Sequence, residues 1–256
     1  MRQITRNNLV RNMAGVCLAF CAFNQGWAQT APPATTRSFV RITQVKPEMA
    51  SEWLALQKNE VNPALKKAGV ASRTMLETVL GNPYEYVSMT PMGNYSELDA
   101  DNPLVKALGK TGAAQLQAKT RRCIESQSVF ASTRVEELTS MPKSPAAIWT
   151  TVRYRVTAGK GQEYENYLKT DIMPVYAKAK AAGKIAGYSV SRRGPGANTR
   201  DRTTVIYADK VASMEAGPIS TQMLGAEAAA KLTAKGASLA ALVEVVVRRR
   251  VADLSY

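Results

Sequence analysis

Residues 52–63 of this chain read EWLALQKNEVNP, and residues 163–174 read EYENYLKTDIMP. Each stretch begins with an acidic residue and an aromatic residue. A second acidic residue follows seven positions after the aromatic one, and then come a β-branched residue, one variable residue and proline. Recurrence of this order within one chain indicates an internal duplication, in which two copies of one structural unit follow each other.

Two further matches support the duplication. Leu108-Gly109 corresponds to Leu224-Gly225, and residues 134–138 (RVEEL) correspond to residues 250–254 (RVADL). The separation from the glycine to the arginine is 25 residues in both copies. Residues 40–42 (VRI) resemble residues 152–154 (VRY), but this match is one residue out of register.

The apolar periodicity and the turn residues predict the same order of elements in both copies, β-α-β-β-α-β. We assign residues 38–140 to the first repeat, 141–147 to a Pro-containing linker and 148–256 to the second repeat. In the first repeat we expect strands at 39–45, 72–80, 84–90 and 127–135, and helices at about 52–68 and 102–122. In the second we expect strands at 148–156, 188–193, 203–208 and within 239–250, the first helix at 161–182, and a second helix after Gly217-Pro218.

The N-terminal residues have the pattern of a secretory signal peptide. Three arginines precede an apolar run over residues 13–23, and Ala28 suits a cleavage site. The run is too short to span a bilayer. We therefore expect residues 1–28 to be a signal peptide and residues 29–37 a disordered lead-in. The mature protein would be periplasmic or secreted, without a transmembrane segment.

The chain carries a formal net charge of +14, and the excess lies mainly in the second half. Residues 29–144 contain 14 basic and 11 acidic residues, whereas residues 145–256 contain 17 and 9. This balance suits an anionic partner, or simply a charged surface that keeps the protein soluble. The basic residues are scattered and are not interleaved with aromatic residues, so we expect no nucleic-acid partner.

The composition argues against several common kinds of site. The chain contains no histidine, which argues against a histidine-ligated haem, a histidine-containing zinc site and a Ser-His-Asp triad. Only Cys123 lies beyond the expected signal peptide, so no intramolecular disulfide is expected. No GxGxxG motif, P-loop or serine elbow is present. We predict neither a cofactor nor a metal.

The order β-α-β-β-α-β is the ferredoxin-like arrangement, in which helices cover one face of a four-stranded sheet. Two such units in one chain can cover each other's bare faces. The chain therefore resembles a tandem-fused member of the dimeric α+β barrel superfamily, which includes antibiotic-biosynthesis-type monooxygenases, NIPSNAP-like proteins and haem-using chlorite dismutase relatives. The resemblance implies an α+β fold with the two repeats packed sheet to sheet, as a monomer with an internal pseudo-dimer. No residue here matches the proximal histidine of the haem branch.

In that superfamily small ligands usually lie between the sheet and the helices, so the duplicated helical motif supplies the candidate site residues. Glu60 and Asp171 are the candidate general bases, since an acid beside aromatic residues can have a raised pKa. Trp53, Tyr164 and Tyr167 would then contact the ligand. The alternative is that each acid lies at the edge of an amphipathic helix and pairs with a neighbouring lysine or arginine.

Four arginines form a second set of candidate ligand-binding residues. Arg41 and Arg153 lie on the expected first strands, and Arg134 and Arg250 lie near the ends of the expected last strands. First and last strands are neighbours in a ferredoxin-like sheet, so each pair of arginines could hold a ligand carboxylate in a fork. The alternative is that these arginines face solvent or pair with acids such as Glu136.

The prolines of the duplicated motif, Pro63 and Pro174, allow two interpretations. A proline inside a helix frees a carbonyl group one turn earlier and kinks the axis, which would suit a pocket beside the acid. Alternatively, each proline begins a new helical segment.

The sequence supports three functional hypotheses without deciding among them, and it leaves open whether the protein is an enzyme. The first is an exported protein that binds a small anionic or aromatic ligand between helices and sheet. The second is a cofactor-independent monooxygenase or isomerase. The third is a basic protein that interacts with acidic polymers of the cell envelope.

Overall fold

We describe residues 37–256 of a computed structural model of the chain. The expected signal peptide and residues 29–36 of the expected lead-in lie outside the described residues. Arg37, expected at the end of the lead-in, is the first residue of a strand. Within residues 37–256, no helix combines the length and the apolar character that crossing a membrane requires.

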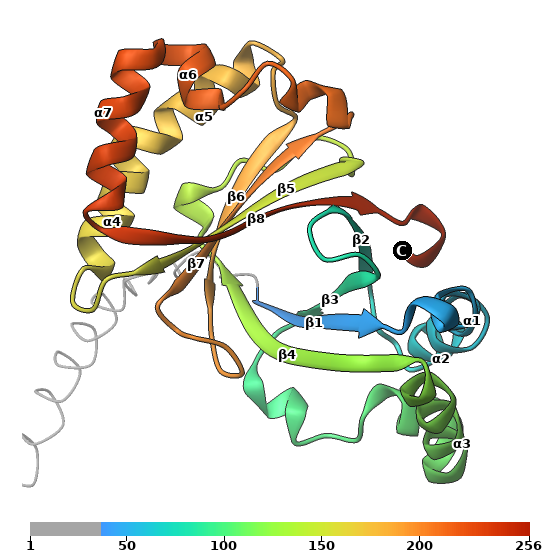
Figure 1. Ribbon diagram of the computed structural model, residues 1–256. Helices are drawn as coiled ribbons and strands as arrows, with labels where there is room; N and C mark the ends of the chain where they lie inside the picture. Colours follow the sequence, from blue (N-terminus) through green and yellow to red (C-terminus); the bar gives the residue numbers. More distant parts are fainter. Residues whose placement is uncertain (1–36) are drawn as a thin grey trace, which may run out of the picture. The chain divides into compact units, whose positions relative to one another are not determined.

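The first repeat has the predicted order of elements (Figure 1). Its strands pair in the order β4-β1-β3-β2, which is the ferredoxin-like order. Its elements are β1 (Arg37–Val45), α1 (Ala50–Leu56), α2 (Asn62–Lys67), β2 (Thr74–Leu80), β3 (Glu85–Met92), α3 (Pro103–Arg122) and β4 (Ile124–Arg134).

The second repeat has the same order. Its second helical region is divided at Gly225, with φ of +80°, and α3 of the first repeat has a matching break at Gly109, with φ of +71°. Its strands pair in the order β8-β5-β7-β6. Its elements are β5 (Ile148–Val156), α4 (Gly161–Tyr167), α5 (Met173–Ala181), β6 (Gly187–Arg193), β7 (Asp201–Ala208), α6 (Ile219–Leu224), α7 (Ala226–Ala237) and β8 (Ala240–Arg250).

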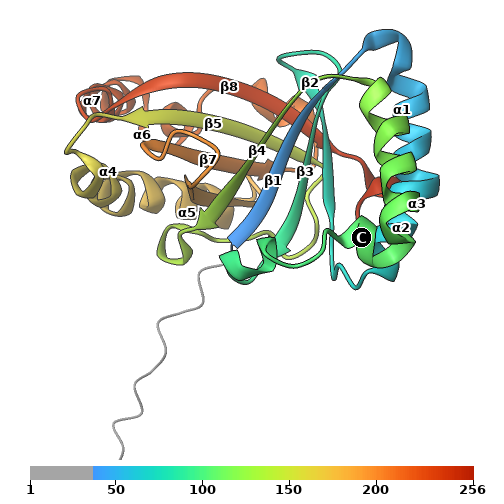
Figure 2. The ribbon, with the colours of Figure 1, turned by 90° about the horizontal axis from the view of Figure 1, so that it is seen from below.

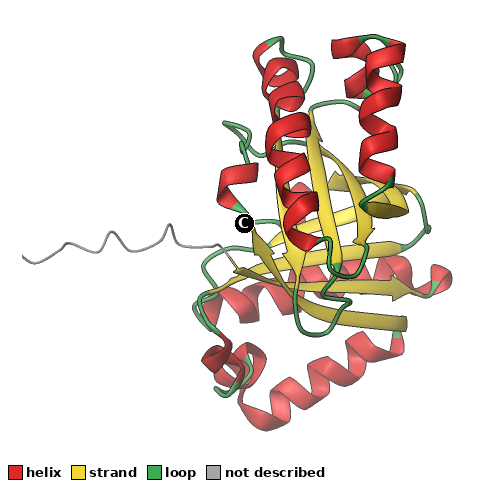
Figure 3. Ribbon diagram, turned by 90° about the vertical axis from the view of Figure 1, so that its left-hand side faces the viewer, coloured by secondary structure: helices red, strands yellow, loops and turns green. Residues whose placement is uncertain are grey.

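The two sheets join edge to edge into one closed, antiparallel eight-stranded barrel. Strand β2 pairs with β8, and β4 pairs with β6, so no sheet edge is left open. The helices lie outside the barrel (Figures 2 and 3). Inside it, side chains from β1, β2, β3 and β4 form an apolar cluster around Val40, Leu76, Val87 and Phe130. The predicted α+β fold, with the bare faces of both sheets covered within one chain, is confirmed.

The duplicated motif forms a helix with a π-helical turn in each repeat. Residues Gln57–Val61 join α1 to α2, and residues Leu168–Ile172 join α4 to α5. The backbone N–H of Asn62 donates to the carbonyl of Gln57, and that of Met173 donates to the carbonyl of Leu168. The wider π turn accommodates a proline that cannot donate and would crowd a regular turn. Pro63 and Pro174 thus both follow a local distortion and lie at the start of the next helical segment.

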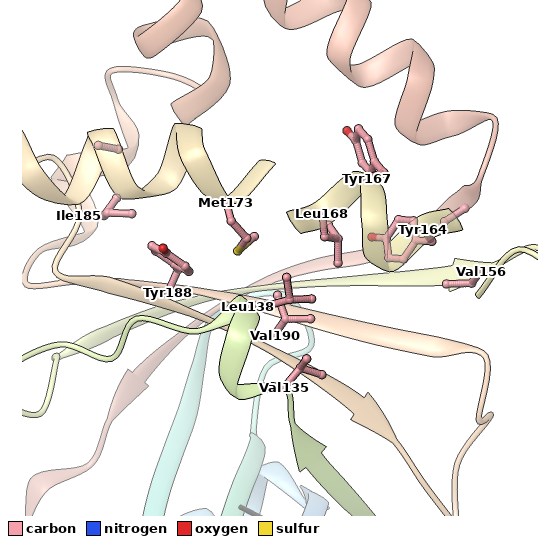
Figure 4. Close-up of a cluster of buried hydrophobic side chains, with 12 residues drawn as sticks. Val135, Leu138, Val156, Tyr164, Tyr167, Leu168, Met173, Ile185, Tyr188 and Val190 are labelled. Atoms are coloured by element: carbon pink, nitrogen blue, oxygen red, sulfur yellow. The ribbon is translucent and has the colours of Figure 1, made fainter. Parts of the chain in front are cut away.

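The segments that follow the last strands cross over to the other repeat. After β4, Val135 and Leu138 enter the core between the helices and the sheet of the second repeat, beside Leu168 and Val190 (Figure 4). After β8, Leu254 enters the corresponding core of the first repeat. The RVEEL and RVADL sequences therefore encode reciprocal contacts between the repeats. The boundary at residue 140 follows the duplication, but residues 135–140 pack with the second repeat.

The β6–β7 turn lies against β4 and requires glycine at one position. Gly196 has φ of +92°, and a Cβ atom there would lie 2.2 Å from the carbonyl oxygen of Val129. We expect Gly196→Ala to lower the free energy of unfolding by about 2 kcal/mol, through the strain of positive φ and the displaced strand. Gly159→Ala is the matched control, because Gly159 has φ of +80° with nothing within 4 Å. Equal losses in urea denaturation would contradict a role for the contact with β4.

Candidate functional site

The space between helices and sheet in the second repeat is filled by apolar and tyrosine side chains (Figure 4). Tyr164 and Tyr167, two of the candidate ligand-binding residues, are buried there. Tyr167 donates a hydrogen bond from its hydroxyl to the carbonyl of Leu232 at 3.0 Å. Burial raises the pKa of Tyr164, and it raises the pKa of Tyr167 to about 12, so both remain neutral. These residues form a core and do not line a described cavity.

The corresponding space in the first repeat contains polar residues at matching positions. By the duplicated motif, Gln57 corresponds to Leu168 and Asn62 to Met173. A third correspondence follows from the backbone. Arg73 and Tyr256 exchange two backbone hydrogen bonds, as Tyr188 and Ser140 do in the second repeat, so Arg73 corresponds to Tyr188. Three buried apolar or aromatic positions of the second repeat are therefore polar in the first.

Arg73 is the centre of this polar group. Its side chain is buried, and it donates from Nη1 to Asn62 Oδ1 at 2.6 Å and from Nη2 to Gln57 Oε1 at 2.8 Å. Asn62 in turn donates to the carbonyl of Leu254 at 3.2 Å. The crossed-over C-terminal segment thus helps to position the group, together with the π-helical turn that carries Gln57.

Arg41 adds a second positive charge to the same interface. Val40 and Ile42 contribute to the apolar cluster inside the barrel, so Arg41 between them points toward the helices. Its guanidinium lies 5.8 Å from the ring centroid of Phe39. Its Nε is buried without a hydrogen-bond partner among the described residues, as are Trp53 Nε1 and the Tyr256 hydroxyl. Counting from the duplicated motif, the corresponding residue in the second repeat is Val152.

The electrostatics of this interface favour an anion. In residues 37–256, neither Arg41 nor Arg73 forms an ion pair with a carboxylate, although burying an unpaired charge is costly. Burial, together with the charge of Arg41, lowers the pKa of Arg73 to about 10. Burial also lowers the pKa of Arg41. Both remain cationic at neutral pH, so their charges are available to an anionic ligand.

The two candidate general bases lie on the helices as ion pairs. Glu60 Oε2 is 2.9 Å from Lys119 Nζ, and Asp171 Oδ2 is 2.8 Å from Lys235 Nζ. The hydrogen bond from Lys235 lowers the pKa of Asp171, whereas a general base at neutral pH needs a raised one. Glu60 also borders a hollow of about 290 Å³ beside α2 and α3. Glu60 and Asp171 therefore each pair with a neighbouring lysine, as the alternative to a general base predicts.

The structure does not form the two expected arginine forks. Arg41 faces the helices. Arg134 lies on the inner face of β4, four residues after Phe130 of the barrel cluster and opposite Ser191. Its Nε donates to Glu136 at 2.9 Å. Arg153 also points into the barrel, but it pairs with Glu244, six residues before Arg250 on β8. The expectation failed because the strand register separates the members of each pair: Arg41 lies opposite Val129, five residues before Arg134, as Arg153 lies opposite Glu244. The one-residue offset between VRI and VRY also places Arg41 and Arg153 on opposite faces of their sheets.

Trp53 lies in the core of the first repeat. Its ring packs against Tyr86 with centroids 4.7 Å apart, and its side chain is buried. Among the described residues no group of three potential His, Cys, Asp or Glu ligands is close enough to hold a metal ion. Since the chain contains no histidine, a histidine-ligated haem does not fit this interface.

Comparison with solved structures identifies the fold. A protein from Lactobacillus acidophilus NCFM, described as a putative monooxygenase, is 7% identical, with a TM-score of 0.57 over 86% of this chain and 95% of its own. An anthrone oxidase-like protein is 11% identical, with a TM-score of 0.58 over 85% and 92%. This chain has the dimeric α+β barrel fold.

Other dimeric α+β barrel structures extend the comparison. One, described as a putative chlorite dismutase TA0507, is 9% identical, with a TM-score of 0.52 over 86% of this chain and 96% of its own. Identities this low establish a common fold and leave the activity open. No protein-family model and no curated protein sequence matches the chain.

Sequence reasoning missed Gln57, Asn62, Arg73 and Tyr256. Two of these could have been identified from the sequence, because aligning the duplicated motifs places Gln57 opposite Leu168 and Asn62 opposite Met173. A polar residue opposite a core residue of a duplicated unit is a signal for a specialised site. Arg73 could not be aligned with a residue of the second repeat, because the two repeats differ in length between the motif proline and the next matched glycine.

Proposed function

We propose that the protein binds a small organic anion, a carboxylate with an aromatic body, between the helices and the sheet of its first repeat. One observation carries the proposal: two arginines between helices and sheet, the buried Arg73 and the half-buried Arg41, have no acidic partner among the described residues. Their positions in the second repeat are Tyr188 and Val152. A ligand carboxylate would supply the missing negative charge. The aromatic rings of Phe39 and Trp53 would contact its apolar body.

The internal duplication supports a functional origin of the polar group. The second repeat packs the equivalent space with hydrophobic side chains, so the fold does not need arginine there. Replacing buried charged groups by well-packed apolar residues often stabilises a protein. Retention of such groups at a cost in stability is common where a site must bind a ligand.

Binding can be tested with the full chain by calorimetry and thermal unfolding in benzoate, with neutral benzamide as the comparison ligand. We expect benzoate to raise the melting temperature and benzamide to have little effect. The double variant Arg41→Val, Arg73→Tyr should lose the benzoate effect. The variant Arg121→Gln, Arg200→Gln is the matched control, since it removes the same charge from exposed positions. A benzoate effect that survives in the first variant would contradict the proposal.

A second measurement separates ligand binding from structural need. The variant Arg41→Val, Gln57→Leu, Asn62→Met, Arg73→Tyr gives the first repeat the residues of the second. We expect its free energy of unfolding to rise by about 1–4 kcal/mol, because buried charges are removed together with their partners. Urea denaturation measures this change. A loss of stability would show that the polar group serves the fold and would leave binding without its main support.

A further inference from the structure

A second basic site lies inside the barrel, on the other face of the sheets. A cavity of about 430 Å³ opens near the start of β4 and the β2–β3 turn. Its lining includes three arginines of the second repeat and polar residues of the first, among them Arg153, Arg193, Arg248, Gln44, Asn82 and Ser128.

Most charges around this cavity are paired. Arg153 donates to Glu244 and to Asp201, each at 2.9 Å. Arg248 donates to Glu85 at 2.7 Å, and the neighbouring Arg155 also donates to Asp201. Together with Arg193, four arginines therefore share three carboxylates. One positive charge is left over within this cluster.

The excess charge lies mainly at Arg193. Its side chain is 12% exposed, and its Nη2 is 3.8 Å from the nearest oxygen of Glu244, which is too long for a hydrogen bond. Its Nε donates to the Thr203 hydroxyl at 3.2 Å, and its guanidinium lies 4.6 Å from the ring centroid of Phe130. These contacts hold the group in place, and Glu244, the carboxylate within ion-pair distance of it, is already hydrogen-bonded to Arg153. Independently, Nε of Arg248 is buried and has no partner among the described residues.

We propose that the barrel cavity binds a small hydroxylated carboxylate of the sugar-acid type. The carboxylate would be held by Arg193, with the unpartnered Nε of Arg248 as a further donor. The lining explains the hydroxylated body: among the described residues, Ile42 is the only aliphatic side chain that lines the cavity, and the others carry amides, hydroxyls or charges. Hydroxyl groups of the ligand can exchange hydrogen bonds with Ser126, Ser128 and the acceptor oxygens of Glu85. This site lies on the opposite face of the sheets from the helix–sheet site of Arg41 and Arg73, and neither proposal depends on the other.

Calorimetry on the full chain with D-gluconate and D-galacturonate tests the proposal, with sorbitol and acetate as comparisons. We expect the sugar acids to bind, and the neutral polyol and the small carboxylate to bind at least tenfold more weakly. Arg193→Met should weaken binding of the sugar acids at least tenfold, because the guanidinium is lost. Arg192→Met is the matched control: the neighbouring side chain pairs with Glu165 on the helix side of the same strand.

A second variant guards against a folding defect in Arg193→Met. Ser128→Leu fills the cavity without changing a charge, and it should abolish binding while far-ultraviolet circular dichroism stays unchanged. The variant Arg41→Val, Arg73→Tyr should retain gluconate binding, so failure here is distinguishable from failure of the helix–sheet site. The proposal is overturned if neither sugar acid binds at about 10 mM, or if both variants bind them like the unmodified protein.

Discussion

Replacing Leu254 with alanine is expected to lower the free energy of unfolding by about 2–5 kcal/mol and to destabilise both repeats together. Leu254 is 2% exposed and contributes to the core of the first repeat, although it follows the last strand of the second. The transfer of its side chain from water is lost, and a cavity remains. Because β2 pairs with β8 and β4 with β6, neither sheet can open without breaking strand pairs of the other.

Leu138, which is equivalent to Leu254 in the duplicated sequence, provides an internal comparison. Leu138 is also 2% exposed and enters the core of the second repeat, so Leu138→Ala should have a similar effect. Leu242→Ala is the surface control, since that side chain is 57% exposed. Urea denaturation followed by hydrogen exchange in each repeat would measure the losses. Two separate unfolding transitions, one per repeat, would refute the expected cooperativity.

The fold was accessible from sequence because the duplication restricted the alternatives. The motif at residues 52–63 and its copy at 163–174 each mark the first helix of a unit, and strand patterns surround both. Once each unit reads β-α-β-β-α-β, the uncovered sheet faces require a partner, and the second repeat provides one. β5 was predicted with its observed bounds, Ile148–Val156.

The crossing of the two C-terminal segments was not accessible in this way. The sequences RVEEL and RVADL showed that the segments are equivalent, but each has the same apolar residues whether it packs on its own repeat or on the other. The choice depends on how the sheets join, through the pairs β4–β6 and β2–β8. Those pairs form between distant parts of the chain, which local patterns do not encode.

The arginines of the candidate site show a similar limit. Arginine is compatible with either face of a strand, so its direction depends on register. Arg41 and Arg153 looked equivalent, yet they lie on opposite faces and belong to different sites. The burial of Arg73 depends on its backbone pairing with Tyr256, which is distant in the sequence. The excess positive charge suited an anionic partner or a charged surface equally, and it lay mainly in the second half, so it did not point to the first repeat.

Replacing Asp201 with asparagine is expected to lower the free energy of unfolding by about 1–3 kcal/mol at neutral pH. The Asp201 side chain is 2% exposed and pairs with Arg153 at 2.9 Å and with Arg155 at 2.8 Å. Removing its charge leaves two arginines of the barrel without their shared carboxylate. The cost lies mainly in the buried hydrogen bonds of Asp201, because Arg153 keeps its ion pair with Glu244 and the Arg155 side chain is 40% exposed.

Asp201 also makes the stability of the protein depend on pH. Burial alone would raise the pKa of Asp201, but the hydrogen bonds from Arg155 and Arg153 outweigh it, and the pKa in the folded protein is lowered. A lowered pKa means that the unfolded chain takes up the proton first. The stabilisation is therefore complete above the ordinary aspartate pKa of about 3.9 and is lost as pH falls through the lowered value.

Urea denaturation between about pH 7 and pH 3 should show a smaller acid-induced loss in Asp201→Asn than in the unmodified protein. Asp209→Asn, at an exposed position, should behave like the unmodified protein. Equal stability of Asp201→Asn and the unmodified protein at pH 7 would show that the ion pairs of Asp201 with Arg153 and Arg155 do not stabilise the fold.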